Sequence, residues 1–92
     1  MGILIVHHLM IQKINNHITY MNMKKLSEVV ELLQKMPMDE VIPVTNPYDV
    51  EKTYTVGALI ADLELVIDYA GDIDYKYLNN AEVVKFISTL NQ

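Results

Sequence analysis

The sequence predicts one compact α+β domain in which three helices pack on a small sheet. Three segments carry apolar residues at helical spacing, and shorter segments between them have the composition or the alternation of strands. The length of 92 residues leaves room for a single hydrophobic core. A small all-α bundle is the alternative that this pattern leaves open.

The first helix is expected near residues 24–36 and is followed by a short strand. Its apolar residues lie three and four positions apart, and they are Leu26, Val29, Val30, Leu33 and Met36. Pro37 ends the helix, because proline lacks the amide hydrogen that the helical ladder needs. Residues 40–45 read as a strand by composition, and Pro43 confines that strand to an edge or an end of the sheet.

The second helix is expected near residues 56–70 and is the central element. Thr55 is a suitable N-cap and Gly71 stands where a left-handed residue ends a helix. The apolar stripe between them consists of Val56, Leu59, Ile60, Leu63, Val66, Ile67 and Ala70. In the stretch before this helix, Val50 and Tyr54 are expected to point inward.

The remaining elements are two further strands and a third helix. In residues 72–77, charged side chains alternate with apolar or aromatic ones, which favours a strand or an extended loop. Residues 3–7 are rich in β-branched side chains and are expected to form a further strand. An asparagine at 79 with Glu82 three residues later resembles a capping box at the start of a helix near 80–90. The expected core is Leu26, Val29, Val30, Leu33, Ile42, Leu59, Ile60, Leu63, Ile67, Val83, Ile87 and Leu90.

Charge divides the chain near Lys25. Residues 1–27 contain no acid, whereas residues 28–92 contain 12 acids against four lysines, a net charge of −8. Met23-Lys24-Lys25-Leu26 reads like a bacterial start, so residues 1–22 are either a peripheral N-terminal segment or a mis-assigned start, and residues 23–92 form the domain. The sequence shows no signal peptide and no apolar run of membrane length, which predicts a cytoplasmic protein without a membrane partner.

Metal, cofactor and enzyme sites find little support. His7, His8 and His17 have no acid nearby to complete a metal shell, and no cysteine exists in the chain. Asp68, Asp72 and Asp74 do not form a calcium loop, because that pattern fails at Lys76, Tyr77 and Val83. The two serines and three glycines form neither a nucleophile elbow nor a phosphate-binding loop, so no cofactor and no catalytic activity are expected.

Direct binding of nucleic acid is also disfavoured, because affinity for phosphate comes from clustered Lys and Arg and this chain has no arginine. Tyrosines and acids instead gather within 14 residues, a combination that favours an interface with a basic protein surface. The candidate binding residues are Glu64, Asp68, Tyr69, Asp72, Asp74, Tyr75 and Tyr77. The alternative is structural: Tyr69 and Tyr75 close the core while the aspartates keep a turn soluble.

The segment Leu26 to Val44 resembles small uncharacterised proteins of phages and mobile elements, in which a helix runs through a Leu/Met-Pro-x-Asp turn into a strand. The residues that carry this resemblance are Leu33, Met36-Pro37-Met38-Asp39 and Val41-Ile42-Pro43-Val44, within about 19 of the 92 residues. The resemblance implies a phage- or mobile-element-encoded inhibitor or regulator of a bacterial host protein, of which anti-CRISPR proteins are one group. A structural or assembly subunit that acts as a homo-oligomer, such as a homodimer, is the alternative function.

Overall fold

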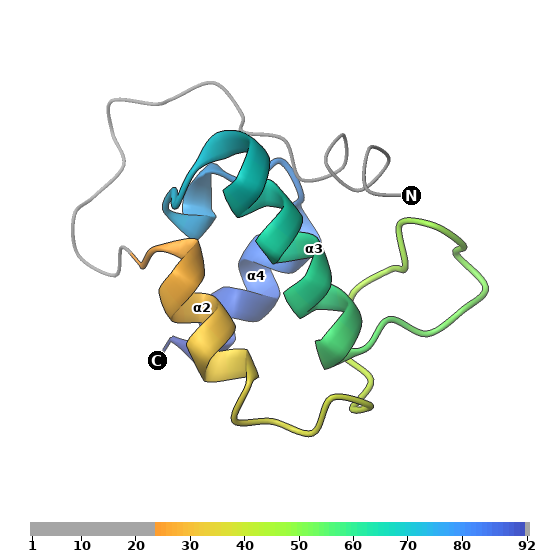
Figure 1. The fold of residues 1–92 in the computed structure, drawn as a ribbon. Helices are drawn as coiled ribbons and strands as arrows, with labels where there is room; N and C mark the ends of the chain where they lie inside the picture. The colour runs from red at the N-terminus through yellow and green to blue at the C-terminus, as the bar shows by residue number, and fades with distance from the viewer. Residues whose placement is uncertain (1–23, 92) are drawn as a thin grey trace.

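The computed structural model describes residues 24–91, which form three α-helices and one short 3-10 helix (Figure 1). The helices are α2 (Leu26–Leu33), α3 (Val56–Ala70) and α4 (Ala81–Leu90), and the 3-10 helix η1 (Tyr75–Tyr77) lies between the last two. The predicted strand at 3–7 and the N-terminal segment 1–22 lie outside the described residues. None of the helices within residues 24–91 has the length and apolarity that a bilayer crossing requires.

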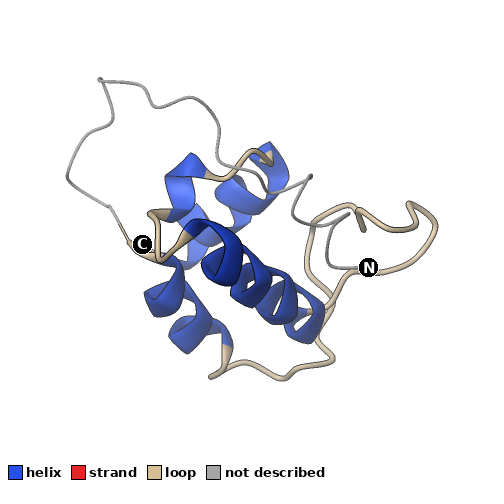
Figure 2. Ribbon diagram, turned by 45° about the horizontal axis from the view of Figure 1, so that its top comes forward, coloured by secondary structure: helices blue, strands red, loops and turns tan. Residues whose placement is uncertain are grey.

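The predicted α+β class is wrong, because the described residues contain helices and loops but no strand (Figure 2). Residues 40–45 pair with the chain before α3 through one isolated bridge, between Val41 and Thr55. The pairing stops there because Pro43 has no amide hydrogen, and because the Val44 amide donates to the carbonyl of Ile42 in its own segment. Residues 24–91 are therefore a helical unit.

The predicted strand at 72–77 is also wrong. The Asp74 carboxylate accepts the backbone N–H of Lys76 at 2.8 Å, and the Tyr77 N–H donates to the Asp74 carbonyl at 3.0 Å. These two bonds turn the chain into η1 directly after one bridge between Lys25 and Asp74. The alternation of apolar and charged residues here reflects a tight turn rather than a strand.

The three helices begin and end close to the predicted positions. For α3 the prediction is confirmed: Thr55 Oγ1 accepts the Ala58 N–H at 3.3 Å, and Gly71 ends the helix with a φ of 88°. The helix α2 stops at Leu33, three residues earlier than expected, and turns lead on to Pro37. The helix α4 begins after Asn80, which accepts the Val83 N–H at 3.1 Å.

Side chains from α2, α3, η1 and α4 meet in one hydrophobic core. Of the twelve predicted core residues, Ile67 and Leu90 are partly buried and the others are buried. The prediction that Val50 points inward is wrong, because its side chain is 78% exposed in the middle of the loop before α3. Tyr54 is buried as expected. Further buried residues, outside those twelve, are Val44, Val56, Val66, Tyr75, Leu78 and Phe86, of which Val56 and Val66 belong to the predicted apolar stripe.

The difference in burial between Leu63 and Ile67 on α3 gives a test of this core. Leu63 is fully buried, so Leu63→Ala should lower the free energy of unfolding by about 2–5 kcal/mol through lost contacts and a new cavity. The matched change Ile67→Ala, on the same helix but partly exposed, should cost less than half as much. Urea unfolding of both variants measures the two values, and equal losses would contradict the packing described here.

Candidate functional site

The structure separates the seven predicted binding residues into three groups by burial. Glu64, Asp68, Tyr69 and Asp72 are exposed, and Tyr77 is half-buried. Asp74 and Tyr75 are buried and take part in the fold instead. The structural alternative therefore holds for Tyr75, which helps to close the core, but not for Asp74, which is buried, or for Tyr69, which is exposed.

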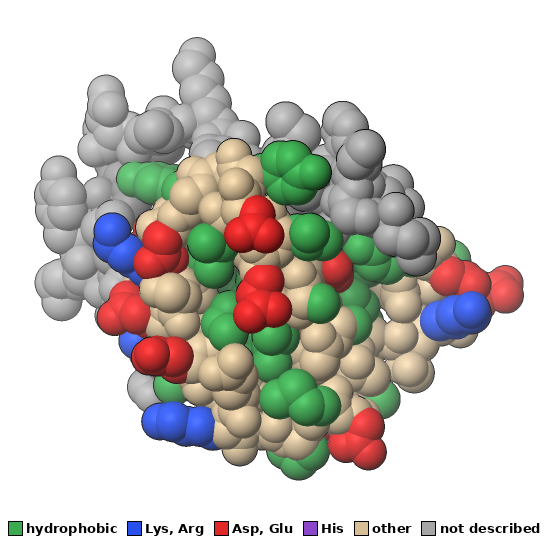
Figure 3. All heavy atoms as spheres, in the orientation of Figure 1, with side chains coloured by type: hydrophobic (Ala, Val, Ile, Leu, Met, Phe, Trp, Pro, Cys, Tyr) green, Lys and Arg blue, Asp and Glu red, His purple; other side chains and the backbone are tan. Residues whose placement is uncertain are grey.

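The four exposed residues form what we name the acidic surface: Glu64, Asp68, Tyr69 and Asp72. Figure 3 shows acidic side chains over α3 with hydrophobic side chains beside them and no lysine between them. Glu64 and Asp68 lie one helical turn apart, so both carboxylates leave the helix on the same side. Tyr69 follows Asp68 in the sequence of α3, and its large aromatic side chain is 69% exposed.

The acidic surface ends at a junction between two distant parts of the chain, residues 24–27 and 72–75. The Leu26 N–H donates to the Ile73 carbonyl at 2.8 Å, and the Tyr75 N–H donates to the Lys24 carbonyl at 3.0 Å. The buried carboxylate of Asp74 accepts the Lys24 N–H at 2.7 Å in addition to that of Lys76. Asp74 thus joins two backbone segments, which explains its burial.

Asp72 caps α2 from outside that helix. Its two carboxylate oxygens accept the Ser27 backbone N–H at 2.8 Å and the Ser27 hydroxyl at 2.6 Å. These hydrogen bonds hold the pKa of the exposed Asp72 carboxyl group below its usual value, since they favour the charged form, and the charge of Lys25 adds to the effect. The carboxylate also lies at the positive end of the helix dipole.

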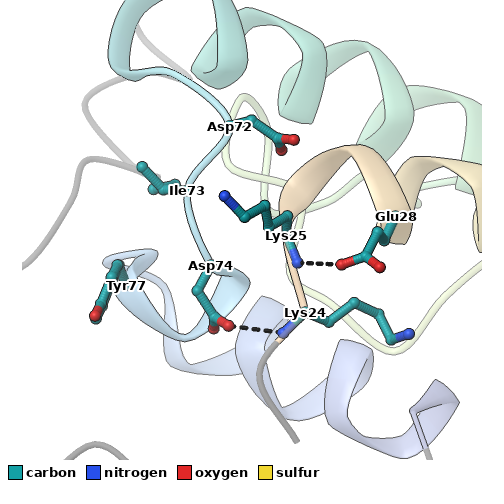
Figure 4. Close-up of a pocket in the computed structure, with 7 residues that line it drawn as sticks. All are labelled: Lys24, Lys25, Glu28, Asp72, Ile73, Asp74 and Tyr77. Atoms are coloured by element: carbon teal, nitrogen blue, oxygen red, sulfur yellow. Dashed lines mark hydrogen bonds between the residues drawn. The ribbon is translucent and has the colours of Figure 1, made fainter. Parts of the chain in front are cut away.

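Tyr75 and Tyr77 have different places in the structure, and Tyr75 serves the packing between η1 and α4. The Tyr75 ring is buried, and its hydroxyl shares a hydrogen bond of 3.2 Å with the hydroxyl of Ser88 on α4. Tyr77 borders a hollow of about 440 Å³ at the junction (Figure 4). The residues that line this hollow are Lys24, Lys25, Glu28, Asp72, Ile73, Asp74 and Tyr77.

The hollow offers no uniform charge to a ligand, because two lysines and three acids line it. Figure 4 shows the Lys25 side chain extending toward Asp72 and Ile73, while the Lys24 side chain points away from them. The dashed bonds join backbone amides to carboxylates, from Lys25 to Glu28 at 2.9 Å and from Lys24 to Asp74. We therefore regard the hollow as part of the junction that supports the acidic surface.

The sequence reasoning missed a buried acid, Asp62 on α3. Its carboxylate accepts hydrogen bonds from the hydroxyl of Tyr54 and, at 3.0 Å, from the hydroxyl of Tyr48. Burial raises the pKa of Tyr48 to about 12 and also raises the pKa of Tyr54. The signal was present in the sequence, since position 62 lies three residues after Leu59 and four before Val66, within the apolar stripe.

Within residues 24–91, no group of three or more His, Asp or Glu side chains is placed to hold a metal ion. His7, His8 and His17 lie outside the described residues. Asp68, Asp72 and Asp74, the residues weighed for a calcium loop, have separate roles, because Asp68 is exposed on α3 whereas the other two bind the start of α2.

Removal of the Asp72 carboxylate should weaken the junction. We expect Asp72→Ala to lower the free energy of unfolding by about 1 kcal/mol at neutral pH, as loss of a helix cap does. Because the pKa of Asp72 is lowered in the fold, its stabilising effect is present above the pKa of the unfolded chain and is lost as pH falls through the folded pKa. The difference between wild type and variant should therefore shrink in acid.

Thermal unfolding of the wild type, Asp72→Ala and Asp68→Ala from pH 7 to pH 2 measures this difference. Asp68→Ala removes the same charge from an exposed position on α3, so it should change stability much less. A loss for Asp72→Ala that stays constant across this pH range would show that the carboxylate does not cap α2.

The acidic surface, supported by the junction, is the candidate functional site of the described residues. No protein-family model, no curated protein and no solved structure matches this chain. The geometry of these residues is therefore what supports a proposal for function.

Proposed function

We propose that this chain is a small non-enzymatic protein-binding module that binds a basic surface of a host protein through the acidic surface. The observation that carries the proposal is the exposed Tyr69 ring on α3, the helix that also bears the exposed carboxylates of Glu64 and Asp68 and is followed by the exposed Asp72. A phage- or mobile-element-encoded inhibitor or regulator that acts in the bacterial cytoplasm, of anti-CRISPR or another anti-defence type, is the role that fits this binding mode.

The two kinds of side chain contribute different parts of the binding energy. An exposed tyrosine offers a large apolar area that gains energy when a partner covers it, and it loses little side-chain entropy in doing so. The carboxylates attract a partner rich in Lys and Arg and speed the encounter, an effect that salt weakens. The net charge of −8 over residues 28–92 acts in the same direction.

The helix supports this role because it holds the surface in place before binding. The opposite side of α3 is fixed in the core by Leu59, Leu63 and Val66, all of which are buried. Little backbone ordering is then required when a partner arrives, which favours affinity.

Charge reversal at Glu64 and Asp68 tests the proposal. The double variant Glu64→Lys with Asp68→Lys should bind a basic partner at least tenfold more weakly, mainly through slower association. Reversal of Asp72 and Asp74 is less informative, because both carboxylates also hold the junction together. The matched control is Asp39→Lys with Glu40→Lys, which changes the net charge equally at two other exposed positions.

The measurement is capture of partners by the immobilised full chain from a bacterial host lysate at low and high salt, followed by mass spectrometry and a binding titration. A stoichiometric basic protein that is lost at high salt and with the Glu64/Asp68 variant, but retained by the control, supports the proposal. Equal binding by both variants would overturn it. Recovery of the chain alone, in multiples of 10.6 kDa, would favour the homo-oligomer instead.

A further inference from the structure

A loop of residues 46–54 leaves the body of the domain just before α3 and returns to it, and Figure 1 shows it projecting beyond the helices. Asn46 organises the start of the loop, since its side-chain oxygen accepts the Tyr48 N–H at 2.8 Å and its amide donates to the Thr53 carbonyl at 2.9 Å. These bonds lie within the loop. They give the loop a shape but do not attach it to α3.

Two tyrosines attach the loop to the helix, and both end on one carboxyl group. The hydroxyls of Tyr48 and Tyr54 donate to separate oxygens of Asp62, which is 5% exposed. The Tyr54 ring is fully buried at the base of the loop, whereas Tyr48 is half-buried and lies nearer the solvent. The protonation state of one residue therefore acts on both points of attachment.

The charge of Asp62 has no cation to balance it among the described residues. The groups that act on its titration are Tyr48 and Tyr54 from the loop, and no lysine and no other acid of α2, α3 or α4 contributes. A buried carboxylate in these surroundings is costly, even with two hydroxyl donors. A protonated carboxyl group avoids that cost and keeps both contacts, since it can accept from one hydroxyl and donate to the other.

We propose that Asp62 is a pH-sensitive latch that holds the 46–54 loop against α3 through Tyr48 and Tyr54, more tightly in acid than at neutral pH. When the loop opens, water reaches the carboxylate and the charged form is no longer penalised. Ionisation of Asp62 thus favours the open loop, and protonation favours the closed one.

The sign of the pH dependence follows from linkage. Burial raises the pKa of Asp62 in the closed state above its usual value, an effect larger than the opposing one of the two tyrosine hydrogen bonds. A raised pKa means that closure is strongest below the pKa of the open state and weakens as pH rises through the pKa of the closed state. Between the pKa of the open state and the pKa of the closed state, the equilibrium constant for loop closure falls by up to about tenfold per pH unit.

Hydrogen exchange at the base of the loop tests the latch. The Ile42 amide donates to the Tyr54 carbonyl, so its protection factor reports closure, and the Leu26 amide at the junction serves as a reference. Carboxyl NMR of the same full-length chain follows the titration of Asp62. In the wild type, protection at Ile42 should fall as Asp62 ionises, relative to protection at Leu26.

Asp62→Asn should remove this pH dependence, because an amide of the same shape cannot ionise in this range. Asp68→Asn, which removes a charge from an exposed position on the same helix, should behave as the wild type does. The same pH dependence in Asp62→Asn as in the wild type would overturn the latch. A measured pKa of Asp62 at or below the usual value for an aspartate would also overturn the latch.

Tyr48→Phe gives an independent test that keeps the ring and the charge, and it decides the question if Asp62→Asn fails to fold. In the wild type, the Tyr48 hydroxyl donates to the charged carboxylate and lowers the pKa of Asp62. Removal of this hydroxyl should therefore shift both the titration of Asp62 and the fall in Ile42 protection to higher pH. Midpoints that stay at the wild-type pH would overturn the proposal.

Discussion

A short antiparallel contact between residues 24–27 and 72–75 holds α2 to the rest of the described domain. Two backbone hydrogen bonds and the carboxylates of Asp72 and Asp74 form this junction. It fixes the start of α2, so that Leu26 and Val29 reach the core beside α3. The same contact holds the chain directly after α3, and with it Asp72, the residue that the junction and the acidic surface share.

The sequence predicts the helices well and the sheet wrongly, for a physical reason. Helix α3 carries its own signals, a threonine cap, an apolar stripe and a terminal glycine, and all are local in sequence. The residues at 40–45 have strand composition, but a strand needs a partner of matching length, and Pro43 with the turn at Val44 limits the pairing to one bridge. Composition at one segment does not contain that information.

The candidate site was predictable only in part, because residue type alone does not show which acids the fold requires. Asp68 is exposed on α3, Asp72 caps a helix 45 residues away in sequence, and Asp74 binds the backbone of Lys24. The burial of Asp62 was not predicted, because a single acid within an apolar stripe looks like an interruption of the apolar pattern. Its role becomes visible only with Tyr48 and Tyr54, which a loop brings to it.

The capping of α2 by Asp72 also bears on the order in which the molecule takes shape during synthesis. Helix α3 finds its N-terminal cap at the neighbouring residue, whereas the start of α2 has a local bond from Lys25 N–H to Glu28 and also takes partners 45 and 50 residues further along the chain. At ribosomal rates of about 5–20 residues per second, this separation amounts to roughly 2–10 s. A helix as short as eight residues is marginal in isolation. The contacts from Asp72 and Asp74 to the start of α2 can therefore form only after α3 has been synthesised, although α2 precedes α3 in the chain.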